Sequence, residues 1–517
     1  MEMQDPIGAL WLIQEYDIPL FLPLIVKSGI ASRRVTEKIS ETGFRIELYQ
    51  EKARPEATLI SHLQFHLKHE IINLEFLARF FKKVGCKEIQ QWINDEPTGQ
   101  YARRAAFLYE WLTEEKLQVP ENIGGNYVDV LNDQWVVTAS PNQVEKNSRW
   151  RVNNNLAGTA DFCPILLKND AFLQSVELNI SVLLNELIAE FGEDLLMRSS
   201  VWLTLRESKA SFTIEGEGNQ TDRIARFADV IARNTGKGDL PLTQEALARL
   251  QQEILGNQTV INHYGIRQSP VFVGQTYRFK EIVHYIAPPY EYLPQKLRGI
   301  LQFWQKTIGQ SAIMRSAVVS FGFVYLHPLA DGNGRVHRFL FNDTLKRDGV
   351  LPDNVILPIS GVIAESAAER LHYANMLDEI SKPLMENLYG LYSFSKEHYT
   401  YADGIKSNLC FNENQLAEPL WRYPDLTKHV IYLAGLIQKV IESDMREESK
   451  YLQQHEQARE AVKNIVDMPN HYIDRIIRSI LQNNGVVGNK LVKEFPFLAD
   501  KTVEDKLVKQ IASIFQT

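Results

Sequence analysis

Cysteine is scarce in this sequence and widely spaced. The 517 residues contain three cysteines, Cys86, Cys163 and Cys410, with no Cys-x-x-Cys pair and no Cys/His cluster. Zinc modules need such clusters, and small secreted domains need a closely spaced cysteine framework, so neither class is expected. A reducing compartment, the cytoplasm, is the expected location.

The sequence also lacks an excess of positive charge. It has 56 lysines and arginines against 64 acidic residues, for a net charge of -8. A dedicated nucleic-acid-binding protein concentrates basic residues on one surface, so nucleic acid is not an expected partner. Residues 455–517 have the texture of a DNA-binding winged helix, but acids balance their basic residues and disfavour that role.

Long hydrophobic runs are missing as well. The first residues carry Glu2 and Asp5 where a secretory signal needs positive charge. The apolar run over 18–26 contains Pro19 and Pro23 and is about half as long as a membrane span. We therefore expect no membrane partner.

The composition is otherwise that of a globular protein, with 44% hydrophobic and 23% charged residues. The length suggests two to four domains. We expect a mainly α fold: a mostly helical N-terminal domain over 1–170 with a small hairpin at 124–139, a helical core over 171–400, and a C-terminal helical domain over 401–517. Two short extended pieces at 271–294 interrupt the core.

Three histidines fall on one face of the helix expected over 56–82. His62, His66 and His69 are spaced i, i+4 and i+7, a spacing that can hold a metal ion. No carboxylate-assisted metalloprotease pattern accompanies them. A polar helix face is the favoured interpretation.

The stretch from His327 to Leu340, HPLADGNGRVHRFL, carries most of the functional information. The preceding residues 312–326 are apolar nearly all round, which predicts a buried helix. The helix is expected to end at His327, because Pro328 cannot continue it. Glycines at 332 and 334 then allow a tight loop whose N–H groups converge on one point.

A second helix is expected from Arg335 to Lys346, so the loop meets a helix N-terminus and makes an anion site. Arg335 and Arg338 lie on one face and suit a polyphosphate. Asp331 would be repelled by phosphate unless magnesium lies between them. His327 can take a proton from a hydroxyl, which predicts in-line attack on a magnesium-bound nucleotide phosphate.

Simpler interpretations exist for each part of this stretch. Asp-Gly-Asn-Gly is a common turn, and a lone histidine is usually a hydrogen-bonded core residue. The full string fixes the residue at eight of twelve positions, which favours the functional interpretation. His337 points off the face of the two arginines and is expected to be incidental.

The pattern His327-Pro-x-x-Asp331-Gly-Asn-Gly-Arg335-x-x-Arg338 resembles the signature of the Fic domain (Fic/Doc family), with Leu329 where the family most often has phenylalanine. The resemblance covers about residues 170–400. It implies a helical core with a β-hairpin flap that transfers AMP from ATP, with Mg²⁺, to a hydroxyl of a target protein.

The resemblance also implies roles for single residues. His327 deprotonates the target side chain and Asp331 holds Mg²⁺. The phosphates are held by the loop residues Gly332, Asn333 and Gly334 and by Arg335 and Arg338. The flap over 271–294 contacts the target near His284, Tyr285, Ile286 and Ala287. Tyr373 resembles an adenine-pocket position, although a core tyrosine is an equally good interpretation.

The sequence ESKASFTIEGEGN at 207–219 resembles the inhibitory helix of Fic proteins whose restraining segment precedes the core (class II type). Ser211, Glu215 and Gly216 fit its Ser-x-x-x-Glu-Gly pattern, within a helix expected at about 200–217. Glu215 is expected to pair with Arg338 and to suppress turnover roughly ten- to a hundredfold. An ordinary helix end with a solvated glutamate is the alternative.

The leading hypothesis is thus an autoinhibited protein adenylyltransferase whose target carries a Ser, Thr or Tyr hydroxyl and can be the chain itself. One alternative is de-AMPylation, or transfer of another nucleotide or phosphate moiety, by the same site. Another is a catalytically weak regulatory binding protein. The resemblance also allows a homodimer.

Overall fold

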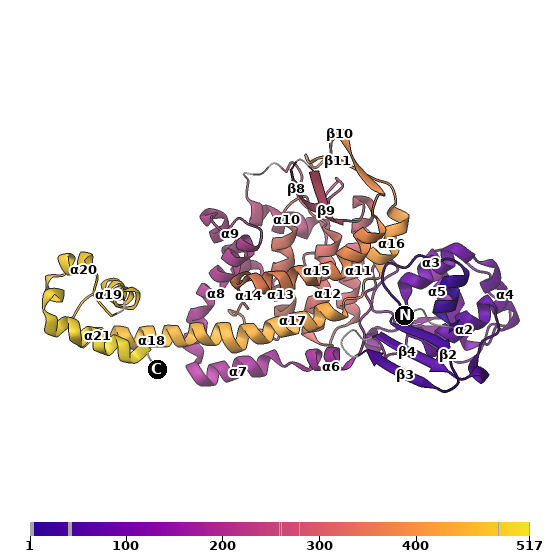
Figure 1. Cartoon of the computed structure of the whole chain (residues 1–517), viewed down its shortest axis with the longest axis horizontal. Coiled ribbons are helices and arrows are strands. Elements are labelled where there is room, and N and C mark those ends of the chain that lie inside the picture. Colours follow the sequence, from indigo (N-terminus) through magenta and orange to yellow (C-terminus); the bar gives the residue numbers. More distant parts are fainter. Residues whose placement is uncertain are drawn as a thin grey trace. The chain divides into compact units, whose positions relative to one another are not determined.

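The computed structural model describes residues 5–39, 44–257, 259, 261–278, 280–483 and 485–515, and helices predominate in it (Figure 1). The expected mainly α fold class is confirmed. Contacts group the chain into two compact units, the first made of residues 1–178, 207–352 and 359–436 and the second of residues 179–206, 353–358 and 437–517. Because this grouping does not follow chain order, the domain boundaries expected at 170 and 400 stay predictions.

The N-terminal part of the first unit combines a small sheet with helices. The sheet has the order β1 (Pro6–Ile7), β2 (Val26–Ile30), β4 (Phe44–Tyr49) and β3 (Val35–Ile39), with β2 and β4 parallel. The helices are α1 (Ala9–Glu15), α2 (Leu59–His69), α3 (Leu74–Val84), α4 (Lys87–Asp95) and α5 (Gln100–Thr113), with a 3₁₀ turn at Glu51–Ala53. Their apolar faces share one core. The sequence did not predict the sheet.

The predicted polar face of the histidine-bearing helix is wrong. His62 and His66 are only 2% and 1% exposed. The N–H of Gly8 donates to Nδ1 of His62 at 3.1 Å, and the His62 ring stacks on Trp11 with 3.9 Å between ring centroids. Nδ1 of His66 lies 2.8 Å from a carboxylate oxygen of Glu70. These imidazoles are core residues that fix α1 and the end of α2.

The hairpin predicted at 124–139 is also misplaced. The antiparallel pair is β6 (Glu145–Asn147) with β7 (Val152–Asn154), and β5 (Val128–Asp129) joins β7 in parallel. A 3₁₀ turn at Pro141–Gln143 precedes β6. The turn residues Asn132 and Asp133 instead form a loop, in which the N–H of Gln134 donates to the side chain of Asn132 at 2.9 Å.

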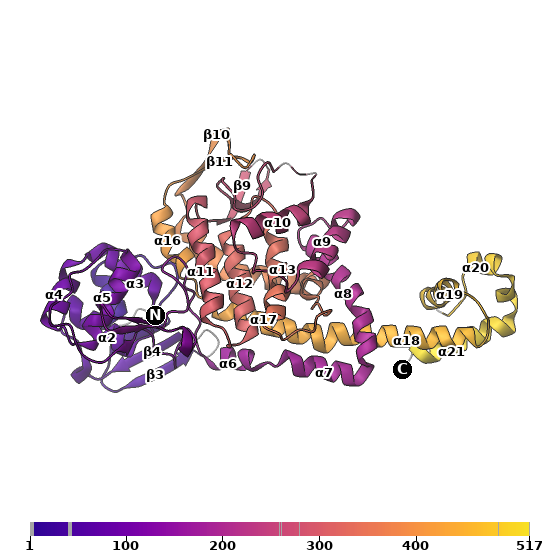
Figure 2. The same ribbon diagram turned by 180° about the vertical axis from the view of Figure 1, so that it is seen from behind.

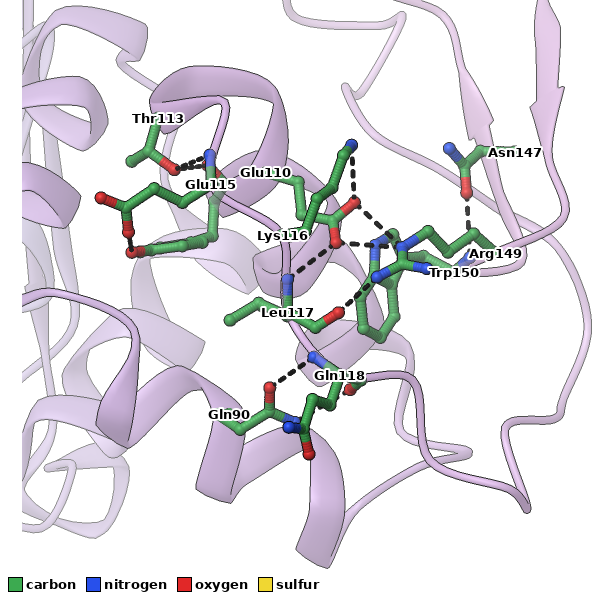
Figure 3. Close-up of polar contacts among 11 residues, drawn as sticks. Gln90, Glu110, Thr113, Glu115, Lys116, Leu117, Gln118, Asn147, Arg149 and Trp150 are labelled. Atoms are coloured by element: carbon green, nitrogen blue, oxygen red, sulfur yellow. Dashed lines mark hydrogen bonds and ion pairs between the residues drawn. The ribbon is translucent and has the colours of Figure 1, made fainter.

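A buried carboxylate holds the loops around α5 together (Figure 3). Glu110 accepts hydrogen bonds from the N–H of Leu117 at 3.0 Å and from Nε of Arg149 at 3.0 Å. Arg149 also donates to the carbonyl of Leu117. Because one carboxylate satisfies donors from two loops, the loops after α5 and after β6 are fixed to the helix without regular structure of their own.

Three helices form the centre of the core that follows. α12 (Ala312–Leu326) lies between α11 (Leu293–Lys306) and α13 (Asn333–Arg347) in both views (Figures 1 and 2). Every residue of α12 after Ala312 is buried, as its apolar sequence predicted. The hydroxyl of Ser316 donates to the carbonyl of Phe341 at 2.9 Å and joins α12 to α13.

The remaining elements of the first unit surround this centre. They are the helices α6 (Asp170–Glu177), α9 (Thr221–Asn234), α10 (Gln244–Leu255), α14 (Ile359–Glu365), α15 (Ala367–Asn387), α16 (Asn414–Arg422) and α17 (Thr427–Lys439), a 3₁₀ turn at Tyr290–Tyr292, and two hairpins. The first hairpin, β8 (Phe272–Tyr277) with β9 (Lys280–Ile286), is the interruption predicted at 271–294; residue 279 lies outside the described residues. The second, β10 (Tyr392–Thr400) with β11 (Lys406–Phe411), was not predicted.

The second unit is helical. It contains α7 (Ile180–Phe191), the first part of α8 (Glu193–Ile214), a π-helical turn at Val440–Met445, α18 (Arg446–Lys463), α19 (Asn470–Gln482), α20 (Asn489–Glu494), a 3₁₀ turn at Pro496–Ala499, and α21 (Lys501–Phe515). Isoleucines of α19 and Leu507 of α21 share a small apolar core. Arg475 pairs with Glu494 and Arg459 with Asp474, so these two guanidinium groups are neutralised by acidic partners.

Among the described residues, no single helix has both the length and the apolar character needed to cross a bilayer. One bent pair, α6 with α7, meets that test only when the two helices are taken together.

Candidate active site

His327 stands at the carboxyl end of α12 in a left-handed backbone conformation, with φ 46° and ψ 55°. Its N–H still donates to the carbonyl of Phe323 at 3.1 Å, so it caps the helix. The following Pro328 disfavours a right-handed helical conformation for His327. A non-glycine residue in the left-handed region is strained, and such strain often occurs at functional positions.

The imidazole of His327 has a defined tautomer. Nδ1 lies 2.7 Å from the carbonyl oxygen of Val324, which can only accept, so Nδ1 carries the proton. Nε2 therefore holds a lone pair. Burial lowers the pKa of His327 to about 4, and the nearby charge of Arg267 adds to the effect. The side chain is a neutral base at pH 7.

The loop after His327 is fixed by its own side chains. The amide of Asn333 accepts from the N–H of Leu329 at 2.9 Å and donates to its carbonyl at 2.7 Å. Gly332 has φ 90°, a conformation that glycine adopts without strain. Asn333, expected at the phosphates, thus has one amide N–H committed to closing the loop.

The loop leads directly into the amino end of α13. Gly332 provides no capping side chain, so the first N–H groups of α13 have none of their usual side-chain partners. A Cβ at Gly334 would lie 2.5 Å from an oxygen of Glu215, so a larger residue there would force that carboxylate to shift. These N–H groups and the helix dipole favour an anion.

Two buried guanidinium groups stand beside this helix end. The side chains of Arg335 and Arg338 are each 3% exposed. Nη1 of Arg335 has no hydrogen-bond partner among the described residues. A buried, unpartnered cationic donor costs free energy, so this atom marks a place where an anion would be stabilised.

Glu215, just after α8, contacts both arginines. Its carboxylate lies 2.5 Å from Nη2 of Arg338 and 3.1 Å from Nε of Arg335. The hydroxyl and carbonyl of Ser211 also accept from Arg338, at 2.7 and 3.1 Å. Gly216 follows with φ 77° and turns the chain away. The contact with Arg338 agrees with the sequence prediction, and the contact with Arg335 is new.

Asp331 is the carboxylate that the sequence proposes for Mg²⁺. Its side chain is 49% exposed and lies 3.2 Å from Nη2 of Arg335. Among the described residues, no group of three or more His, Cys, Asp or Glu side chains is arranged to hold a metal ion. A single accessible carboxylate fits Mg²⁺, which commonly binds through one or two carboxylates together with substrate phosphates.

Gln251 of α10 is a site residue that the sequence did not indicate. Its side-chain amide donates to the carbonyl of Asp331 at 2.8 Å and accepts from the N–H of Gly265 at 2.8 Å. Ile266 forms a β-bridge to Leu329. The loop is thus held from outside by Gln251, which lies 80 residues before Asp331, and by Ile266, a relation that no local pattern reveals.

The flap residues divide into one exposed side chain and three buried ones. His284 is exposed, whereas Tyr285, Ile286 and Ala287 are 5%, 1% and 5% exposed. The hydroxyl of Tyr285 donates to the carbonyl of Tyr325 at 2.7 Å and anchors the hairpin on α12. The assignment of these residues to target contacts stays a prediction, and the buried three could take part only through their backbone.

Tyr373 and His337 lie behind the arginines. Both are buried, and their rings stack with 6.1 Å between centroids. Nδ1 of His337 lies 2.8 Å from the carbonyl of Ser320, so it is a hydrogen-bonded core residue, as expected. Burial raises the pKa of Tyr373, and the adjacent Arg338 opposes that rise. The assignment of Tyr373 to an adenine pocket stays a prediction.

Residues 241–345 match the model of the Fic/DOC family. The chain is 33% identical over 137 residues to the protein adenylyltransferase fic-1 of Caenorhabditis elegans, which is 26% of this chain and 24% of the relative. It is 24% identical over 176 residues to a probable protein adenylyltransferase of Aquifex aeolicus, covering 33% and 53% of the two chains. The match spans about a quarter of the nematode protein.

A solved structure of a Fic family protein from Desulfovibrio desulfuricans G20 aligns with 64% of this chain and 89% of its own, at 17% identity and a TM-score of 0.39. The segment that matches the family model includes the His327 loop and both arginines. Residues 241–345 of this chain are therefore a Fic/DOC family domain.

Proposed function

We propose that this protein transfers AMP from ATP to a hydroxyl of a protein side chain and is restrained by Glu215. The observation that carries the proposal is the juxtaposition of two buried guanidinium groups with a helix end that has no side-chain cap, directly after a histidine whose Nε2 carries the lone pair. The relatives named as protein adenylyltransferases support the same reaction class.

In the proposed reaction the phosphates of ATP occupy the anion site. The N–H groups at the start of α13 bind the inner phosphates, and Arg335 and Arg338 bind the distal ones. Asp331 would hold Mg²⁺, which, when bound, neutralises charge on the phosphate oxygens. This placement fixes the direction in which the pyrophosphate leaves.

His327 then acts as the general base. Nε2 takes the proton of the target hydroxyl while the hydroxyl oxygen bonds to the α-phosphorus. The bond from that phosphorus to the bridging oxygen breaks, and pyrophosphate leaves. The hydrogen bond from Nδ1 to Val324 keeps the ring in the tautomer that this step requires.

Glu215 restrains the reaction by occupying both arginines. A charge-assisted hydrogen bond contributes about 1.5–3 kcal/mol, and about 1.4 kcal/mol corresponds to a factor of ten in rate. A distal phosphate must displace the carboxylate to reach the guanidinium groups. Replacing Glu215 by glycine is therefore expected to raise transfer about ten- to a hundredfold.

Labelling with ATP and Mg²⁺ tests the proposal. Glu215→Gly should label protein, itself included, more strongly than the unmodified chain, and adding His327→Ala should abolish the label. Glu217→Gly is the matched control, because Glu217 pairs with Arg223 outside the site, 3.0 Å away. The same amount of label in the unmodified chain, in Glu215→Gly and in the variant that also carries His327→Ala would refute the proposal.

A further inference from the structure

Arg267 is a buried arginine whose side-chain hydrogen-bond partners, among the residues that the structure describes, are all backbone carbonyls. It is 1% exposed. Nε donates to the carbonyl of His327 at 2.7 Å, Nη1 to that of Ser269 at 2.5 Å, and Nη2 to that of Pro288 at 2.5 Å. One side chain thus joins three separate parts of the chain.

Two of these parts belong to the proposed reaction centre. His327 carries the proposed base, and Pro288 follows directly after β9 of the flap. The N–H of Arg267 donates to the carbonyl of Pro328 at 2.8 Å, and the N–H of Ala287 donates to the carbonyl of Val271 at 3.1 Å. The base of the flap and the turn at His327 therefore meet at Arg267.

The second hairpin holds the Arg267 segment from the other side. Asp403, in the loop between β10 and β11, is fully buried. Its carboxylate accepts from the N–H of Gln268 at 2.8 Å and the hydroxyl of Ser269 at 2.7 Å. Its carbonyl accepts from the N–H of Asn262 at 3.1 Å. Asp403 thereby fixes both ends of the segment.

The chemistry of this position requires a guanidinium group. The carbonyl of His327 lies at the end of α12, where it has no partner in the next turn, and a cation there also complements the helix dipole. Arginine offers five donors in a rigid planar fork, whereas lysine offers one compact charge. Burial lowers the pKa of Arg267 to about 10, so it stays charged at neutral pH.

We propose that Arg267 is a positioning residue. It fixes the backbone of His327 relative to the base of the flap, and the hydrogen bonds of Asp403 hold the Arg267 segment in place. This inference rests on the proposed transfer reaction. Arg267 does not contact the phosphate site. Arg267 instead sets the angle between the imidazole of His327 and a target hydroxyl that the flap aligns. A displacement of the imidazole by about 1 Å lowers the rate on the order of a hundredfold.

Arg267→Met in the Glu215→Gly background tests the proposal. The matched control is Arg103→Met, because Arg103 is 2% exposed and also donates to backbone carbonyls, those of Arg151 at 2.6 Å and Asn126 at 2.9 Å. Both variants should lose thermal stability. Only Arg267→Met should lower kcat, by about a hundredfold, while the Kd of ATP measured by calorimetry stays unchanged. Arg267→Lys should recover part of kcat.

Amide hydrogen exchange provides a readout besides activity. The N–H groups of His327 and Ala287 should exchange about tenfold faster in Arg267→Met and not in Arg103→Met, because local hydrogen bonds are lost. If the Glu215→Gly parent shows no transfer, the proposed function fails, and the exchange rates still decide the role of Arg267. Equal kcat in the two variants, or equal exchange, overturns the inference.

A second variant covers the case in which Arg267→Met does not fold. Asp403→Asn keeps the shape of the side chain and weakens its acceptor bonds to Gln268 and Ser269, so kcat should fall several-fold with the Kd of ATP retained. Unchanged kcat in Asp403→Asn would also contradict the inference.

Discussion

At the scale of the residue, the neighbours of His327 determine its chemistry. Pro328 disfavours a continuing helix, Val324 fixes the proton on Nδ1, and Arg267 holds the carbonyl. The first two relations are local, and the sequence indicated Pro328 as a helix stop. The contact with Arg267 joins residues 60 positions apart, and no residue pattern in either segment predicts it.

The low pKa of His327 predicts a specific pH profile. A base works only when unprotonated, so activity is lost as pH falls through the pKa of the bound-state histidine. With a pKa of about 4, kcat of the Glu215→Gly variant should stay level from neutral pH down to about pH 5 and fall only below it. Initial rates across this range, with circular dichroism to verify folding, provide the measurement. A half-loss near pH 6.5, the ordinary value for histidine, would contradict the assigned environment.

At the scale of the element, α8 and the residue that follows its last turn carry the proposed restraint along one face. Glu207, Ser211 and Glu215 are spaced by four residues each. Glu207 accepts from the N–H and hydroxyl of Ser360 at 2.7 and 2.5 Å, and Ser211 and Glu215 bind Arg338. The Ser-x-x-x-Glu-Gly pattern indicated the last two. The sequence pattern did not predict a role for Glu207, because its partner Ser360 lies 153 residues away.

This arrangement predicts a graded response in α8. Ser211→Ala removes one acceptor from Arg338 and leaves Glu215, so labelling should rise about three- to tenfold, less than in Glu215→Gly. Ser208→Ala is the control, since the equally buried Ser208 donates to the carbonyl of Ile224 instead. Quantified labelling of the three variants provides the test. An equal rise in Ser211→Ala and Ser208→Ala would point to general loosening of the helix.

At the scale of the whole molecule, sequence patterns predicted the helical class and the tight loop after His327 better than the N-terminal fold. The loop residues are consecutive, so glycine, proline and charge spacing determine their local geometry. The four-stranded sheet was missed because β1 has two residues and β2 pairs in parallel with β4 across an intervening strand segment. The buried His62 resembled a surface residue because its partners, Gly8 and Trp11, lie about 50 residues earlier.

The two compact units predict separable stability. Ile477 is fully buried in the small core of the second unit, and Ile300 is fully buried in the first. Each substitution to alanine should cost about 2–5 kcal/mol through lost burial and a cavity. In differential scanning calorimetry, Ile477→Ala and Ile300→Ala should shift different transitions. A shift of one shared transition by both would show that the units unfold together.

The most direct test of the central claim uses ATP labelled at a chosen phosphorus. With the Glu215→Gly variant, label at the α-phosphorus should appear on a protein hydroxyl, label at the γ-phosphorus should not, and His327→Ala should remove the signal. Mass spectrometry of the modified peptide should then give the mass of one adenylate. Transfer of γ-label, or α-label that persists without the imidazole, would contradict the account.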